Sequence, residues 1–216
     1  MPREVLMIII VIVSTLVIQG GFLLMQQRLI DQVTGALMKQ DYEKFDRLME
    51  KKTVKYLIAP FNQDYLKLNR YSLAGDTDKI IECYDQFAQR RLTYGQAKEV
   101  YLSAFDYFLS RGDKQRCQLF RDRINDLTSK KENIDGIKEI VNDSYDVYLD
   151  HKTDMLDRLL KQIEDLPETH RGAKEAMIAK IYENLGNKKK AEEYHKLSEE
   201  HMKAFLTLQK AKESAK

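Results

Sequence analysis

Hydrophobic residues follow two different patterns along this chain. The first is a continuous apolar run, Val5–Met25, and no charged residue occurs between Glu4 and Arg28. A helix of roughly 20 mostly apolar residues is long enough to cross the hydrocarbon core of a membrane. A helix also satisfies its backbone hydrogen bonds internally, as lipid requires. The run therefore predicts a transmembrane helix and a membrane anchor over residues 1–27.

Two other interpretations of this run are a cleavable secretory signal and a buried core helix. A signal has a shorter apolar core of about 7–15 residues and a small-residue cleavage site, whereas Phe22–Gln27 contains no Ala-x-Ala-like site. A buried core helix needs a large apolar protein around it, and the rest of the chain is too polar to supply one. The pattern therefore favours the membrane anchor.

The second pattern is a periodic break between helical segments, and it extends over residues 28–202. Three of the five breaks are a glycine followed by Asp or Asn. Glycine accepts the left-handed conformation that ends a helix, and Asp or Asn can cap the next helix. Each break therefore predicts a turn between two antiparallel helices. With spacings of 35, 37, 39 and 35 residues, the breaks are Gln40, Gly75, Gly112, His151 and Gly186.

Apolar or aromatic residues occupy the same places around every break. The two places downstream of the break share one helix face because they are three residues apart. A helix pair cannot bury this face alone, and stacking of neighbouring pairs buries it. The predicted fold class is therefore all-α, with an N-terminal transmembrane helix and a solenoid of about five helical hairpins. The residues are Ala36, Tyr71, Phe108, Val147 and Tyr182 (four before the break), Phe45, Ile80, Cys117, Leu156 and Ala191 (five after), and Leu48, Cys83, Phe120, Leu159 and Tyr194 (eight after).

The last of these units carries the clearest motif. Ile178–Asn187 resembles the large–small–x–x–aromatic–x–x–x–Gly–Asn core of the tetratricopeptide repeat, and the unit around Gly112 is the next most similar. The resemblance implies a tetratricopeptide-like array over residues 28–202 that acts as a scaffold for protein contacts, with no particular partner indicated. Residues 203–216 are expected to form a capping helix and a frayed tail.

Composition and motifs narrow the possible chemistry. Charged residues make up 32% of the chain, but the net charge is only +2 and both signs are interspersed, so no nucleic-acid binding is expected. Cys83 and Cys117 lack the spacing of a zinc site and are interpreted as core residues. His195 and Glu199 could share a metal ion, although a surface pair is commoner. Protease, phosphate-loop, dinucleotide and serine-hydrolase motifs are absent, so no catalytic, cofactor or metal site is predicted and the chain is not expected to be an enzyme.

Three tyrosines in predicted first helices are candidates for a partner-binding groove. Aromatic side chains anchor protein interfaces, and solenoids bind partners along a concave surface built from first helices. Three basic residues could flank this groove. Packing between helices is the alternative for each tyrosine. The candidates are Tyr65, Tyr101 and Tyr145, with Lys67, Arg70 and Lys98.

The distribution of charge around the apolar run bears on its orientation. Arg3 precedes the run, and Arg28, Lys39, Lys44 and Arg47 follow it within about 20 residues, the distance over which positive charge favours the cytoplasmic side. The predicted location is the cell membrane, with a single span and a slight preference for a cytoplasmic array. The opposite orientation, with the array exported across the membrane, remains an alternative because folded domains translocate largely regardless of charge.

Three functions follow from this organisation. The first is a non-catalytic adaptor that brings proteins or peptides to the membrane. The second is a structural subunit of a larger membrane assembly, in which Gly20 and Gly21 pack against other helices. The third, an enzyme with a site assembled from dispersed residues, is the least favoured because no convergent set of catalytic groups is visible.

Overall fold

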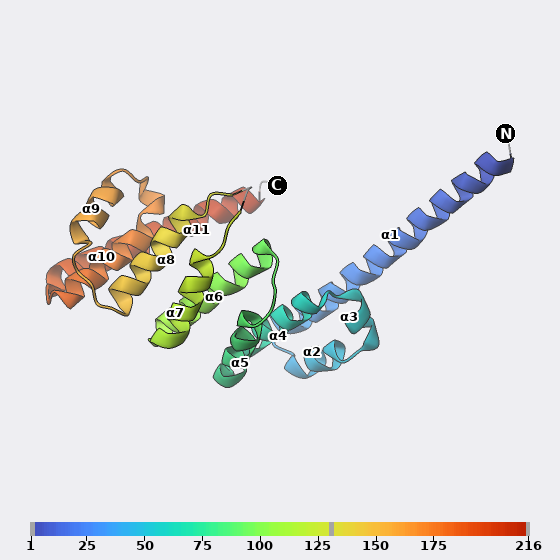
Figure 1. Cartoon of the computed structure of the whole chain (residues 1–216), viewed down its shortest axis with the longest axis horizontal. Helices are drawn as coiled ribbons and strands as arrows, with labels where there is room; N and C mark the ends of the chain where they lie inside the picture. Colours follow the sequence, from blue (N-terminus) through green and yellow to red (C-terminus); the bar gives the residue numbers. More distant parts are fainter. Residues whose placement is uncertain (1–2, 130–131, 215–216) are drawn as a thin grey trace. The chain divides into compact units, whose positions relative to one another are not determined.

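The computed structural model describes the backbone of residues 3–129 and 132–214, and the side chains of residues 19–129 and 132–211. Within these ranges the chain forms eleven α-helices and one 3₁₀ helix, with no strand (Figure 1). The all-α class predicted from the sequence is therefore confirmed. The chain divides into two compact units, Met1–Gln89 and Arg90–Lys216.

The first unit begins with the long helix α1 (Arg3–Met38), which continues without a break through Gly35. It pairs with α2, and α4 pairs with α5. The first helices of these two pairs, α1 and α4, also contact each other. The remaining helices of the unit are α2 (Tyr42–Met49), α3 (Lys52–Leu57), α4 (Pro60–Ala74) and α5 (Thr77–Ala88).

A hydrophobic core in the first unit joins the second half of α1 to α2 and α3. Leu29 and Val33, one helical turn apart on α1, are buried in this core with Phe45 of α2 and Val54 of α3. The short helix α3 has no counterpart in the two-helix repeat that the sequence predicts. It ends just before Pro60, which occupies the first turn of α4, where its missing N–H is not needed.

The predicted membrane span falls largely on residues whose side chains are not described, because Val5–Ile18 lies outside the range given above. Among the described residues, no helix is both long enough and apolar enough to cross a membrane.

The second unit contains two tightly paired sets of helices, α6 with α7 and α10 with α11. Helix α8 packs against α6, α7 and α10, so the first helices of consecutive pairs are neighbours, as stacking of hairpins requires. Helix α9 packs on α10. The bounds are α6 (Tyr94–Arg111), α7 (Lys114–Asn125), α8 (Asp135–Tyr148), α9 (Leu156–Glu164), the 3₁₀ helix η1 (Glu168–His170), α10 (Gly172–Asn184) and α11 (Lys188–Ser214).

Helix α11 continues to Ser214, so residues 203–214 extend this helix and do not form a separate one. Phe205 packs edge-on against His170, with ring centroids 5.6 Å apart. Leu206 and Leu208 are 56% and 47% exposed. Of these three side chains, Phe205 is therefore the one that packs on the second unit.

The five predicted breaks are confirmed by the backbone. Among the described residues, positive φ angles occur only at these five positions, with values from 54° to 75°. At four breaks the next side chain accepts a hydrogen bond from the backbone N–H three residues further on, and so caps the following helix. The break at His151 lacks this cap, because Lys152 carries no acceptor. The capping residues are Asp41, Asp76, Asp113 and Asn187.

The periodic apolar positions around the breaks are also confirmed as interior positions. None of the fifteen side chains is exposed. Four of them are half-buried and the rest are buried. The half-buried ones are Tyr71, Cys83, Leu156 and Tyr194. The apolar pattern therefore marks the packed faces of the helix pairs in both units.

The left-handed conformation of His151 leads to a stability prediction. A side chain at positive φ costs about 1 kcal/mol because Cβ crowds the following carbonyl, and glycine avoids this cost. The imidazole of His151 is exposed, so burial does not offset the cost. His151→Gly should therefore stabilise the chain by roughly 0.5–1 kcal/mol, whereas Gly112→Ala should destabilise it by about 1 kcal/mol. Urea denaturation in mild detergent measures both, and a lower midpoint for His151→Gly would contradict this reasoning.

Candidate interaction surfaces

The three groove candidates in the first unit lie on α4 and contact their own unit. The ring of Tyr65 is half-buried and stacks on Phe61, with centroids 5.8 Å apart. Lys67 forms an ion pair of 3.2 Å one turn away on the same helix. The guanidinium of Arg70 donates to Asp46 of α2 at 2.9 Å. Arg70 therefore ties α4 to α2, and its side chain is less exposed than that of Lys67.

The two groove candidates with aromatic rings in the second unit are buried. Tyr101 of α6 is 6% exposed and its ring lies 5.9 Å from that of Phe120. Tyr145 of α8 is 2% exposed, and the guanidinium of Arg121 lies 4.0 Å from its ring centre. Both tyrosines therefore pack between helices, which is the alternative that the sequence left open, and neither offers a face to a partner.

Lys98 belongs to a small polar cluster at the start of α6. Its ammonium bonds to Glu132, and the same carboxylate accepts a hydrogen bond of 3.2 Å from the hydroxyl of Tyr94. The bond to Lys98 lowers the pKa of Glu132 and raises the pKa of Lys98. Lys98 thus ties Glu132, which lies shortly before α8, to α6. Of the six groove candidates, Tyr101 and Tyr145 are thus buried, whereas those on α4 are half-buried.

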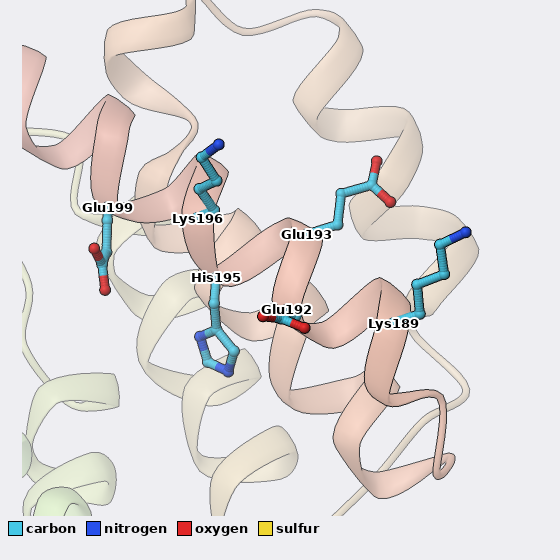
Figure 2. A pocket seen from close by; sticks show the side chains of 6 residues that line it. All are labelled: Lys189, Glu192, Glu193, His195, Lys196 and Glu199. Carbon is cyan, nitrogen blue, oxygen red and sulfur yellow. The ribbon is translucent and has the colours of Figure 1, made fainter.

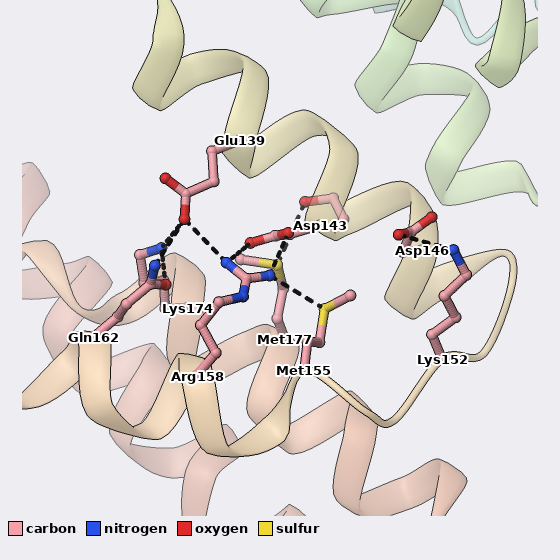
Figure 3. A network of polar contacts seen from close by, with 10 residues as sticks. Glu139, Asp143, Asp146, Lys152, Met155, Arg158, Gln162, Lys174 and Met177 are labelled. Atoms are coloured by element: carbon pink, nitrogen blue, oxygen red, sulfur yellow. Dashed lines mark hydrogen bonds and ion pairs between the residues drawn. The ribbon is translucent and has the colours of Figure 1, made fainter.

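A polar network joins α8, α9 and α10 (Figure 3). The guanidinium of Arg158 donates to both oxygens of Asp143, at 2.7 and 3.1 Å, and to Glu139 at 3.0 Å. Gln162 also donates to Glu139, and Lys174 donates to Gln162, both at 2.7 Å. Asp143 is only 6% exposed, so its charge needs this bidentate partner. The network fixes α9 to α8, and its charges are already paired.

The outer face of α11 carries a shallow depression lined by charged residues (Figure 2). Helical spacing places Glu192, His195 and Glu199 in one row. The imidazole of His195 lies 2.8 Å from the carboxylate of Glu183 on α10. Hydrogen bonds from Lys180 and then His195 lower the pKa of Glu183. Within the described ranges no group of three or more His, Cys, Asp or Glu is arranged to hold a metal ion.

A second, more apolar pocket lies where η1 meets the end of α11. Gly172 at the start of α10 makes this contact possible, because a Cβ there would lie 2.5 Å from Cγ of Met202 and 3.2 Å from its backbone nitrogen. The carbonyl of Gly172 also accepts a hydrogen bond of 2.8 Å from the buried hydroxyl of Ser198. The lining residues are Thr169, His170, Gly172, Ala173, Met202 and Phe205.

Neither cysteine forms a disulfide; Cys117 is fully buried and Cys83 is half-buried. Burial raises the pKa of Cys117 to about 12. A thiol with this pKa is almost entirely protonated near neutral pH, so Cys117 has no nucleophilic character there. Cys117 therefore lies in the core, as the periodic apolar pattern of the sequence predicts.

The packing of the first unit leaves an apolar surface of α1 exposed. Phe22, Leu23, Leu24 and Met25 are between 48% and 65% exposed. Because successive helical residues are 100° apart, these four side chains surround the helix on all sides. The amide of Gln26 then donates to the carbonyl of Leu57 at 2.8 Å, and α1 is packed from there on. Gln26 therefore marks the boundary between the exposed and the packed parts of α1.

No family model matches the chain, and no curated protein or solved structure is significantly similar to it. The structure alone therefore indicates the class to which the protein belongs. The chain is an all-helical protein with helix pairs joined at left-handed turns, compatible with a helical-repeat solenoid.

Proposed function

We propose that this chain is a single-pass membrane protein whose tetratricopeptide-like helix pairs act as a non-catalytic scaffold for other proteins. The observation that carries the proposal is the apolar surface that surrounds α1 at Phe22–Met25. Each Å² of apolar surface left in water costs about 25 cal/mol relative to burial. A helix that is apolar on all sides is typical of a lipid environment or of a protein core. Lipid around Val5–Met25 would remove this cost.

The scaffold part of the proposal rests on the helix pairs. Their regular turns, their buried seams and the motif at Ile178–Asn187 are typical of solenoids that bind proteins or peptides. Since α1 passes unbroken from the exposed segment into the core around Leu29 and Val33, the anchor would hold the first unit close to the bilayer. The basic residues after the run favour the cytoplasmic face for the array.

Extraction of membranes at alkaline pH tests the anchor. The full chain should stay in the membrane pellet. The double substitution Val13→Arg and Leu16→Arg should release it, because each arginine near the centre of a span costs about 2.5–3.5 kcal/mol. Arginines at exposed positions of α5, Asp78→Arg and Glu82→Arg, provide the matched control and should leave the chain in the pellet. Extraction of the unaltered chain into the soluble fraction would contradict the anchor.

Affinity purification from a detergent extract tests the scaffold. Partner proteins should be recovered with the full chain and lost when residues 28–216, which contain the whole array, are deleted. If the same proteins are recovered with and without these residues, or none is recovered reproducibly, the scaffold proposal fails.

The second candidate function is a structural subunit of a membrane assembly. A Cβ placed at Gly20 or Gly21 meets no atom within 4 Å, so this stretch of α1 is open to the close approach of another helix. Exchange of Val5–Met25 for an unrelated span should then abolish the assembly. An unchanged size of the detergent-solubilised complex would exclude this function and favour the scaffold.

A further inference from the structure

We propose that α3 is a membrane-contacting element whose basic surface binds anionic lipid headgroups, and this inference rests on the membrane anchor proposed above. The α3 surface consists of Lys51, Lys52, Lys55 and Tyr56. All four side chains are exposed, and Tyr56 is 87% exposed. The occupant that fits this surface is the membrane in which α1 would reside.

The contact between Gln26 and Leu57 determines how far α3 would lie from the proposed membrane. The Gln26 amide donates to the Leu57 carbonyl at 2.8 Å, so α3 lies beside the point where the exposed apolar part of α1 ends (Figure 1). Val54 and Leu57 hold α3 there, since both are buried in the core with Leu29. With Val5–Met25 in the hydrocarbon region, Tyr56 would lie at the level of the headgroups, where tyrosine is enriched.

The charge of the α3 surface fits this position. Glu50 is the only acidic residue in the segment 50–59, against the three lysines at positions 51, 52 and 55. Arg28, two residues beyond Gln26, is also exposed. Two of the lysines lie at the N-terminal end of α3, where positive charge weakens a helix. These lysines therefore do not stabilise α3, and anionic headgroups would compensate for their mutual repulsion.

The absence of tryptophan from the sequence allows a direct test. Tyr56→Trp introduces a single emission probe into the full chain, which is reconstituted into mixed phosphatidylcholine–phosphatidylserine vesicles. Spin labels on the headgroup of one lipid or the other quench a nearby tryptophan. Leu73→Trp is the matched control, because Leu73 is 54% exposed and lies at the far end of α4, about 20 Å from Pro60 at 1.5 Å per residue.

The emission of the Tyr56→Trp variant should be quenched more strongly than that of the Leu73→Trp variant, and more strongly by labelled phosphatidylserine than by labelled phosphatidylcholine. Each lysine near an anionic surface favours binding about fivefold, so adding Lys55→Gln should reduce the preference for phosphatidylserine by about that factor. Replacement of all three lysines by glutamine should abolish the preference. High salt should reduce it as well, since salt screens exposed charges.

Two results would overturn the inference. One is equal quenching of the two tryptophan variants, and the other is equal quenching of Tyr56→Trp by the two labelled lipids while the lysines are present. Alkaline extraction of the same vesicles separates this failure from failure of the anchor. A chain that resists extraction but shows either result disproves only the role of α3, whereas a chain that is extracted disproves the anchor itself. Circular dichroism of each variant confirms that the helices are intact.

Discussion

Replacement of Phe120 by alanine is expected to destabilise the second unit by about 4 kcal/mol, because it removes a large buried ring and leaves a cavity. The side chain is 0% exposed. Its ring stacks on Phe108 at 5.8 Å and lies 5.9 Å from Tyr101. Both partners belong to α6, so Phe120 is the main aromatic contact that holds α7 against α6. Such aromatic contacts add about 0.5–1.5 kcal/mol to the burial of apolar area.

Urea denaturation of the full chain in mild detergent measures this loss. Leu119→Ala is the matched control, because Leu119 precedes Phe120 on α7 but is 39% exposed. It should change the free energy of unfolding by roughly 0.5 kcal/mol or less. The loss of stability for Phe120→Leu should fall between those of the two alanine variants, since leucine keeps part of the buried volume. Equal losses for the alanine variants at 119 and 120 would show that the seam between α6 and α7 does not stabilise the second unit.

The turns and seams of this fold could be predicted because their causes are local. A glycine followed by Asp or Asn both ends one helix and caps the next, and the apolar residues recur at helical spacing on each side. The same spacing predicts breaks at Gln40 and His151, which are not glycine, and both residues adopt positive φ. Such a break can be recognised from the surrounding sequence alone, without knowing which helices pack against it.

Helix α3 could not be predicted, because its cause is a tertiary contact. The segment Glu50–Lys52 contains neither proline nor glycine, and nothing in it marks the end of one helix and the start of another. The chain turns there because Val54 and Leu57 are buried in the same core as Leu29 of α1. The same turn brings three lysines back to Gln26, from which they are at least 25 residues distant in sequence. A count of charges close to the apolar run therefore misses them.

The tyrosines show a different limit. Tyrosine has an apolar ring and a polar hydroxyl, so spacing alone does not distinguish a groove from a core. Tyr101 is buried because Phe120 of α7 covers it, and Tyr145 because Arg121 lies over its ring. Glu175 is a similar case, since it is one of 34 acidic residues and is buried only because α11 folds over α10.

The buried position of Glu175 leads to the second large expected effect. Glu175 is 2% exposed, and Nδ1 of His201 lies 2.8 and 3.0 Å from its two carboxylate oxygens. A carboxylate only accepts hydrogen bonds, so His201 is the donor. His201→Ala would leave a buried carboxylate without this partner, and this should cost about 3 kcal/mol. The pair therefore locks α11 onto α10 through a buried polar contact.

A double-mutant cycle isolates this interaction. Glu175→Leu combined with His201→Ala should recover most of the stability, because an apolar side chain at position 175 needs no hydrogen-bond partner. His195→Ala is the matched control on the same helix. His195 also pairs with a glutamate of α10 at 2.8 Å, but the side chains of this pair are 50% and 41% exposed. An exposed pair contributes about 0.2–1 kcal/mol, so the loss at His201 should be several times larger. Equal losses at the two histidines would mean that water, and not His201, satisfies the Glu175 carboxylate.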